Sequence, residues 1–138
     1  MKYTMEQLSN MNEKGTGFRG LTGLRVLSAG DGHCIVELEI EDKHLNPLGT
    51  VHGGCLYTLA DEAGGIASAT AGGVGPTISG DMYFMRSLVG AKHLRAEARL
   101  IKAGKRIRVA EVVITDEKGN EACKCVLQYM DLGLLNVD

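Results

Sequence analysis

The residues best suited to chemistry lie in one segment, Asn46 to Thr70. A polar loop leads into His52-Gly53-Gly54, and a long, mostly apolar stretch without proline follows. One acidic pair, Asp61 and Glu62, interrupts that stretch. Burying an unpaired carboxylate is costly or shifts its pKa, so an acid within an apolar helix indicates a chemical role. The two glycines predict a helix start at which a ligand comes close to the backbone.

Length and composition restrict the possible functions. The 138 residues are expected to form one domain, residues 1–138. A net charge of −2 gives no reason to expect nucleic acid or an anionic membrane as a partner, and only 4% of the residues are aromatic, which disfavours base stacking. No apolar run is long enough to span a bilayer, and the first residues lack a signal-peptide pattern. We therefore expect a cytoplasmic protein with no membrane partner.

The cysteines are expected to be reduced thiols. None of the four forms a CxxC pair, and Cys123 and Cys125 would share one face of a strand, where they are poorly placed to bridge each other. The histidines and cysteines do not have metal-ligand spacing, so the sequence predicts no metal and no other cofactor.

Apolar and charged residues alternate along much of the chain, which predicts antiparallel strands. The clearest strand is 33–41, with one apolar and one charged face. Other strands are expected from Leu24, from Thr77, and over 94–100, 110–114 and 123–129, with hairpin turns at 102–105 and 116–120.

Two helices are expected. A short one is predicted over 3–13, with a glycine-marked loop at 15–20 after it. The long one is placed at about 52–70, after a loop over 42–51, and it is apolar around most of its circumference, so it should be buried. One long helix and five or six antiparallel strands predict an α+β fold in which the sheet curls around the helix. His44, in the loop, is expected at the surface.

This order of elements and one motif resemble the hotdog fold, in particular the acyl-CoA thioesterases of the phenylacetate-degradation type. The motif reads N-x-x-G-x-x-H-G-G-x(6)-D, and its residues are Asn46, Gly49, His52, Gly53, Gly54 and Asp61. The resemblance runs from about residue 42 to the C-terminus. It implies hydrolysis of acyl-CoA thioesters without a cofactor, by a homodimer or homotetramer whose active sites lie at the interface between two protomers.

The resemblance gives Gly53 N–H the role of main oxyanion donor, with Gly54 beside it, although the glycines could instead form a tight turn or a helix–sheet contact. Asp61 would be a general base for water or a nucleophile; otherwise it is a solvated or salt-bridged carboxylate. Glu62, about 100° further round the helix, is the rival acid. Asp61 lies roughly 10 Å along the helix from Gly54, too far for both to act on one carbonyl. The resemblance resolves this gap by pairing each aspartate with the oxyanion hole of the partner.

Four further residues have two possible roles each. His52 is either a general acid or base, or a cap that fixes the loop before the helix. The Asn46 amide positions the water or the thioester, or holds the loop. In relatives, a serine or threonine near residue 77 orients the water, so Thr77 is the candidate and Ser79 the reserve, although either residue could instead be purely structural.

Coenzyme A carries phosphates, so basic residues should lie near the mouth of the site. The candidates are Arg86, Lys92, Lys102, Lys105, Arg106 and Arg108, although each could belong to a solvated strand face. Tyr57 is expected to line the acyl pocket or to pack in the core.

Two other functions remain possible from the sequence. A hotdog dehydratase or hydratase would use a histidine with an acid, and His52 and Asp61 supply those residue types. A non-catalytic acyl-CoA binding protein would have no need for Asp61.

Overall fold

The computed structural model describes residues 4, 6–7, 10 and 17–133. A short helix, α2 (Gly17–Thr22), precedes the strands β1 (Arg25–Gly30) and β2 (His33–Glu39). One turn of 3-10 helix (Asp42–His44) and a loop lead to the long helix α3 (Gly53–Thr70). Four strands complete the fold: β3 (Thr77–Phe84), β4 (His93–Ala103), β5 (Ile107–Asp116) and β6 (Glu121–Met130).

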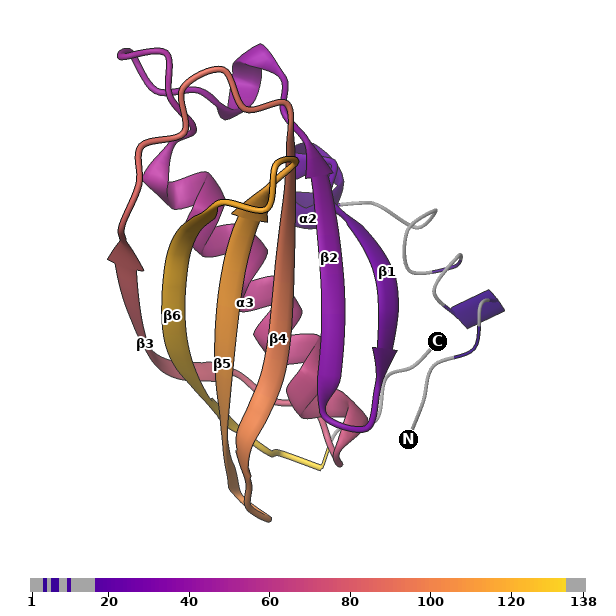
Figure 1. Ribbon diagram of the computed structural model, residues 1–138. Helices are drawn as coiled ribbons and strands as arrows, with labels where there is room; N and C mark the ends of the chain where they lie inside the picture. The colour runs from indigo at the N-terminus through magenta and orange to yellow at the C-terminus, as the bar shows by residue number, and fades with distance from the viewer. Residues whose placement is uncertain (1–3, 5, 8–9, 11–16, 134–138) are drawn as a thin grey trace.

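The six strands form one antiparallel sheet that curves around α3 (Figure 1). Their order is β1-β2-β4-β5-β6-β3, so β3 and β1 are the two edges. The predicted α+β hotdog fold, with a long helix wrapped by five to six strands, is confirmed. No helix within the described ranges combines the length and the apolar character needed to cross a membrane.

The core lies between α3 and the concave face of the sheet. Alternate strand residues such as Val36, Val112 and Leu127 point at the helix and are buried, while their neighbours point outward. The helix contributes Leu59 and Ala63, both fully buried. Removing this apolar surface from water holds the helix against the sheet, since burial stabilises by roughly 25 cal/mol per Å².

A β-bulge at Ile78 changes which way the start of β3 faces. Thr77 pairs with Tyr129, but the register then slips, so that Ser79 pairs with Gln128 and Gly80 with Leu127. In a regular strand, Thr77 and Gly80 would lie on opposite faces, because they are three residues apart. The extra residue places both on the face toward α3.

Two expectations near the N-terminus are wrong. Residues 17–22 are helical rather than a loop. His44 is only 4% exposed, because Nδ1 accepts from Glu41 N–H and Nε2 lies 2.6 Å from the carbonyl oxygen of Thr22, which joins the loop to α2. The helix predicted over 3–13 lies largely outside the described residues, although Glu6, Gln7 and Asn10 are helical.

Candidate active site

Three successive turns of α3 face the edge strand β3. Gly53 lies against the Phe84 ring, since a Cβ there would be 3.4 Å from the ring. One turn later the Tyr57 hydroxyl packs on the backbone of Gly80 and leaves no room for a side chain at that position. One turn further, Asp61 bonds to Thr77. Residues four apart in a helix share a face, so this alignment follows from the spacing 53, 57, 61.

The Asp61 carboxylate is held through one of its two oxygens. The Thr77 hydroxyl donates to Oδ1 at 2.7 Å, and the Tyr129 hydroxyl shares its single proton between the Asp61 carbonyl oxygen at 3.0 Å and Oδ1 at 3.2 Å. Oδ2 accepts no hydrogen bond from any described residue. A hollow of about 260 Å³ opens here, between α2, α3 and the start of β3.

The neighbouring acid, Glu62, has a different environment. It forms an ion pair with Arg19 of α2, which the sequence did not single out. The charge of Glu62 is thus matched by this guanidinium, whereas Asp61 bonds to the hydroxyls of Thr77 and Tyr129.

His52 caps the start of α3. Its Nδ1 accepts a 2.8 Å hydrogen bond from Gly54 N–H, and its backbone is extended with φ −61° and ψ 134°. The cap uses the Gly54 N–H, whereas Gly53 N–H has no acceptor among the residues that the structure describes. This free donor lies at the positive end of the helix dipole, the arrangement that stabilises a developing oxyanion.

A pocket of about 370 Å³ adjoins the helix start. Gly53, Phe84 and Arg86 all line it, so the predicted oxyanion donor and one predicted phosphate ligand share one hollow. Within one protomer, the Gly53 pocket and the Asp61 hollow are therefore separate cavities at different turns of α3.

Asn46 uses its whole amide inside the loop before α3. Its Oδ1 accepts from the N–H groups of Leu48 and Thr50, and its Nδ2 donates to the Thr50 hydroxyl at 2.8 Å. Gly49, between these residues, has a φ of 78°, a left-handed conformation that favours glycine. The contacts correspond to the loop-holding alternative, and a direct role of Asn46 in catalysis stays a prediction.

Replacing Asn46 by alanine should therefore loosen the loop that delivers Gly53. We expect Asn46→Ala to lower the free energy of unfolding by about 1 kcal/mol in urea titrations, as for the loss of a typical hydrogen-bonded side chain. Asn46→Asp keeps the acceptor oxygen and should retain most of that stability. An unchanged unfolding midpoint for Asn46→Ala would contradict this role.

The remaining predicted residues are dispersed. Ser79 lies on the face of β3 that points away from α3, so Thr77 and not Ser79 meets Asp61. Lys105 and Arg106 lie in the β4–β5 turn, at the opposite end of the sheet from the loop that precedes α3 (Figure 1). Arg108 is wrong as a phosphate ligand, because its buried guanidinium pairs with Asp131 at 2.5 Å and donates to Gly73 O.

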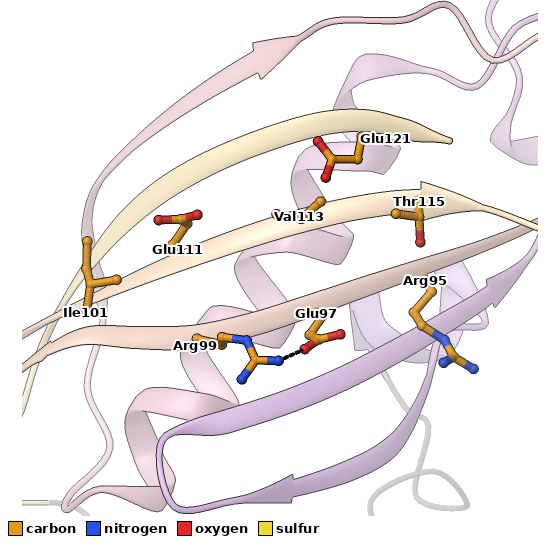
Figure 2. A pocket seen from close by; sticks show the side chains of 8 residues that line it. All are labelled: Arg95, Glu97, Arg99, Ile101, Glu111, Val113, Thr115 and Glu121. Carbon is orange, nitrogen blue, oxygen red and sulfur yellow. Dashed lines mark hydrogen bonds and ion pairs between the residues drawn. The ribbon is translucent and has the colours of Figure 1, made fainter. Parts of the chain in front are cut away.

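A further hollow, of about 370 Å³, lies on the outer face of the sheet and holds none of the predicted site residues. Figure 2 shows the side chains from β4, β5 and β6 that line it. One of the acids in this hollow, Glu97, is hydrogen-bonded to His33 and forms an ion pair with Arg99. These contacts hold the pKa of Glu97 below its usual value. No group of three or more metal-ligating side chains is present anywhere in the described part of the chain.

Tyr129 is, besides Arg19, a residue at the site that sequence reasoning missed. It ends the alternating apolar face of β6, which reads as core. The available signal was a tyrosine hydroxyl at the end of this apolar face. Its position opposite Thr77 follows only from the pairing of β3 with β6, which the sequence does not show.

Comparison with known proteins supports the fold and the chemistry. The family model described as the thioesterase superfamily matches residues 48–123. Acyl-coenzyme A thioesterase 13 of Mus musculus is 30% identical over 121 residues, which are 85% of this chain and 86% of the relative.

Two solved structures are also similar. A Streptococcus mutans protein bound to acetyl CoA has a TM-score of 0.77 at 28% identity, covering 82% of this chain and 91% of that one. A variant of the phenylacetic acid degradation protein PaaI from Thermus thermophilus has a TM-score of 0.78 at 31% identity, covering 83% and 98%.

The chain belongs to the thioesterase superfamily, as the match over more than half of its length shows. It is a thioester hydrolase with a hotdog fold, and the resemblance seen in the sequence is confirmed.

Proposed function

We propose that this protein hydrolyses acyl-CoA thioesters at sites shared between two copies of the chain, with Gly53 N–H from one copy and Asp61 from the other. The observation that carries the proposal is the alignment of Gly53, Tyr57 and Asp61 along β3. The two reactive groups face the same edge strand but lie in separate hollows.

One protomer cannot bring both groups to one thioester. Eight residues of helix span about 12 Å, whereas donor and base must each come within about 3 Å of the reacting atoms or of one bridging water. Tyr57 occupies the turn between them and packs against Gly80, so the direct path along the helix is filled.

The edge strand offers a way to bring the groups together. Phe84, beside Gly53, is at one end of β3, and Thr77, beside Asp61, is near the other. If β3 pairs antiparallel with β3 of a second copy about a two-fold axis, the Phe84 end of each strand meets the Thr77 end of the other. Each Gly53 then faces Asp61 of the partner subunit. The exposed apolar residues of this edge, among them Ile78, Tyr83 and Phe84, would be covered.

The groups supply what thioester hydrolysis needs. Asp61 takes a proton from water, and the resulting hydroxide attacks the carbonyl carbon. Gly53 N–H and the α3 dipole stabilise the negative charge that develops on the carbonyl oxygen. Collapse of the tetrahedral intermediate breaks the C–S bond and releases the free acid and the thiolate, which takes up a proton to give the thiol.

Several observations support acyl-CoA as the substrate class. A mouse relative is named an acyl-coenzyme A thioesterase, and a similar structure contains acetyl CoA. Arg86 lines the Gly53 pocket, where its guanidinium can bind phosphate. In the antiparallel pairing, the β4–β5 turn of the second copy, with Lys105 and Arg106, is at the same end as that pocket. Release of free thiol from a panel of acyl-CoA esters tests this class, and no thiol release from any of them would contradict it.

Complementation between two inactive variants tests the shared site. Gly53→Pro removes the oxyanion donor and Asp61→Asn removes the base. Equal co-expression should recover about a quarter of the wild-type activity, because half of the pairs are mixed and each mixed pair has one intact site of two.

The matched control is co-expression of Asp61→Asn with Asp61→Ala, which should recover nothing. A mixture of Gly53→Pro and Asp61→Asn that stays as inactive as its components would place both groups in one protomer and overturn the shared site.

A further inference from the structure

Tyr129 is a buried residue that contacts the proposed base and has no role in the chemistry described so far. Its side chain is 2% exposed, yet its hydroxyl oxygen lies 3.0 Å from the Asp61 carbonyl oxygen and 3.2 Å from Oδ1. One side chain therefore fixes both the backbone and the carboxylate of Asp61. A tyrosine that served only the core would not need to reach the one acid that faces β3.

The surrounding residues are shaped for this contact. A Cβ on Gly64 would overlap the Tyr129 hydroxyl, and a Cβ on Gly65 would lie 3.5 Å from its ring. The pair of glycines on α3 thus leaves the space in which the hydroxyl reaches Asp61. Thr77 lies directly across from Tyr129 on β3, and the bulge at Ile78 aims it at the same oxygen.

We propose that Tyr129 is a positioning residue that holds the Asp61 carboxylate by Oδ1, so that Oδ2 is the oxygen that accepts the proton from water. The proposal rests on the proposed role of Asp61. Two donors on one oxygen fix the rotation of the carboxylate, while Oδ2, which no described residue engages, keeps its lone pairs for the reaction.

The tyrosine stays a donor under working conditions. Burial raises its pKa, and the nearby Asp61 charge and the hydrogen bond to it raise the pKa further. The hydroxyl therefore remains protonated, and it does not compete with Asp61 as a base.

Tyr129→Phe removes only the hydroxyl and tests the proposal. We expect kcat to fall about tenfold or more, because a hydrogen bond to a charged group is lost, while KM stays within about twofold. Gly64→Ala keeps the hydroxyl but displaces it, and it should also lower kcat more than it changes KM. If Tyr129→Phe folds poorly, Gly64→Ala still tests the proposal.

A double-variant cycle separates positioning from a general packing effect. In an Asp61→Asn protein, adding Tyr129→Phe should change the residual rate by less than about twofold, because the carboxylate through which Tyr129 acts is already gone. If instead the rate losses of the two single variants multiply in the double variant, Tyr129 acts through packing and not through the carboxylate, and the proposal is overturned.

The outcomes also separate this inference from the proposed function. A wild-type rate for Asp61→Asn would overturn both. A low rate for Asp61→Asn together with wild-type kcat for a folded Tyr129→Phe would overturn only the role of Tyr129.

Discussion

Replacing Asp61 by asparagine is expected to lower kcat for a good acyl-CoA substrate by about 10³-fold, since a positioned general base contributes about 10² to 10⁴-fold. The amide keeps the size of the side chain and an oxygen that can accept from Thr77 and Tyr129, so the fold and the helix packing should persist. Thiol release measures the rate, and circular dichroism with size-exclusion chromatography checks that the variant stays folded and assembled.

Glu62→Gln is the matched control, since it neutralises the adjacent carboxylate on the same helix. Glu62 pairs with Arg19 and does not contact Thr77 or Tyr129, so we expect kcat within a few-fold of wild type and at most a small loss of stability. If Glu62→Gln were the inactive variant and Asp61→Asn the active one, the base would be misassigned.

Replacing Gly53 by proline is expected to lower kcat by about 10² to 10³-fold, the usual cost of losing one oxyanion donor. Gly53 is the first residue of α3, where proline is well tolerated because its missing N–H has no partner within the helix. His52, with ψ 134°, already has the extended backbone that a following proline requires. The substitution thus removes a single N–H while the helix start stays in place.

Gly53→Ala is the control for this variant. It adds a Cβ at 3.4 Å from the Phe84 ring, which is an ordinary contact, and it keeps the N–H. We expect it to retain most of the activity. Comparable losses in the alanine and proline variants would point to crowding against Phe84 rather than to a missing donor.

Local sequence patterns predicted much of the fold. The long helix begins at Gly53, one residue after its predicted start, because the histidine cap and the glycines mark a helix N-terminus locally. The hairpins of β4, β5 and β6 follow from alternation and turn composition, which also act over short distances.

The contacts around Asp61 could not be predicted in the same way. Tyr129 lies 68 residues from Asp61, and their contact requires the last strand, β6, to pack against α3. Thr77 joins them only because β3 pairs with β6, which is not its neighbour in the chain. The bulge at Ile78 leaves no clear mark in the sequence, although it decides that Thr77 rather than Ser79 meets the carboxylate. The partner of Glu62 was equally hidden, since it belongs to a short helix in a region read as a loop.

The place of β3 in the sheet also affects when a working protein can arise during folding. Strands β4, β5 and β6 follow one another along the chain and can pair early, whereas β3 must close a long loop containing β4 and β5 before it docks on β6. Until that late step, Asp61 cannot accept the hydrogen bond from Thr77. The edge strand β3, with which a second copy would pair, is also not yet in place. We therefore expect catalytic competence to arise last, after the helix and the meander are formed, so that a partly folded chain carries no active carboxylate.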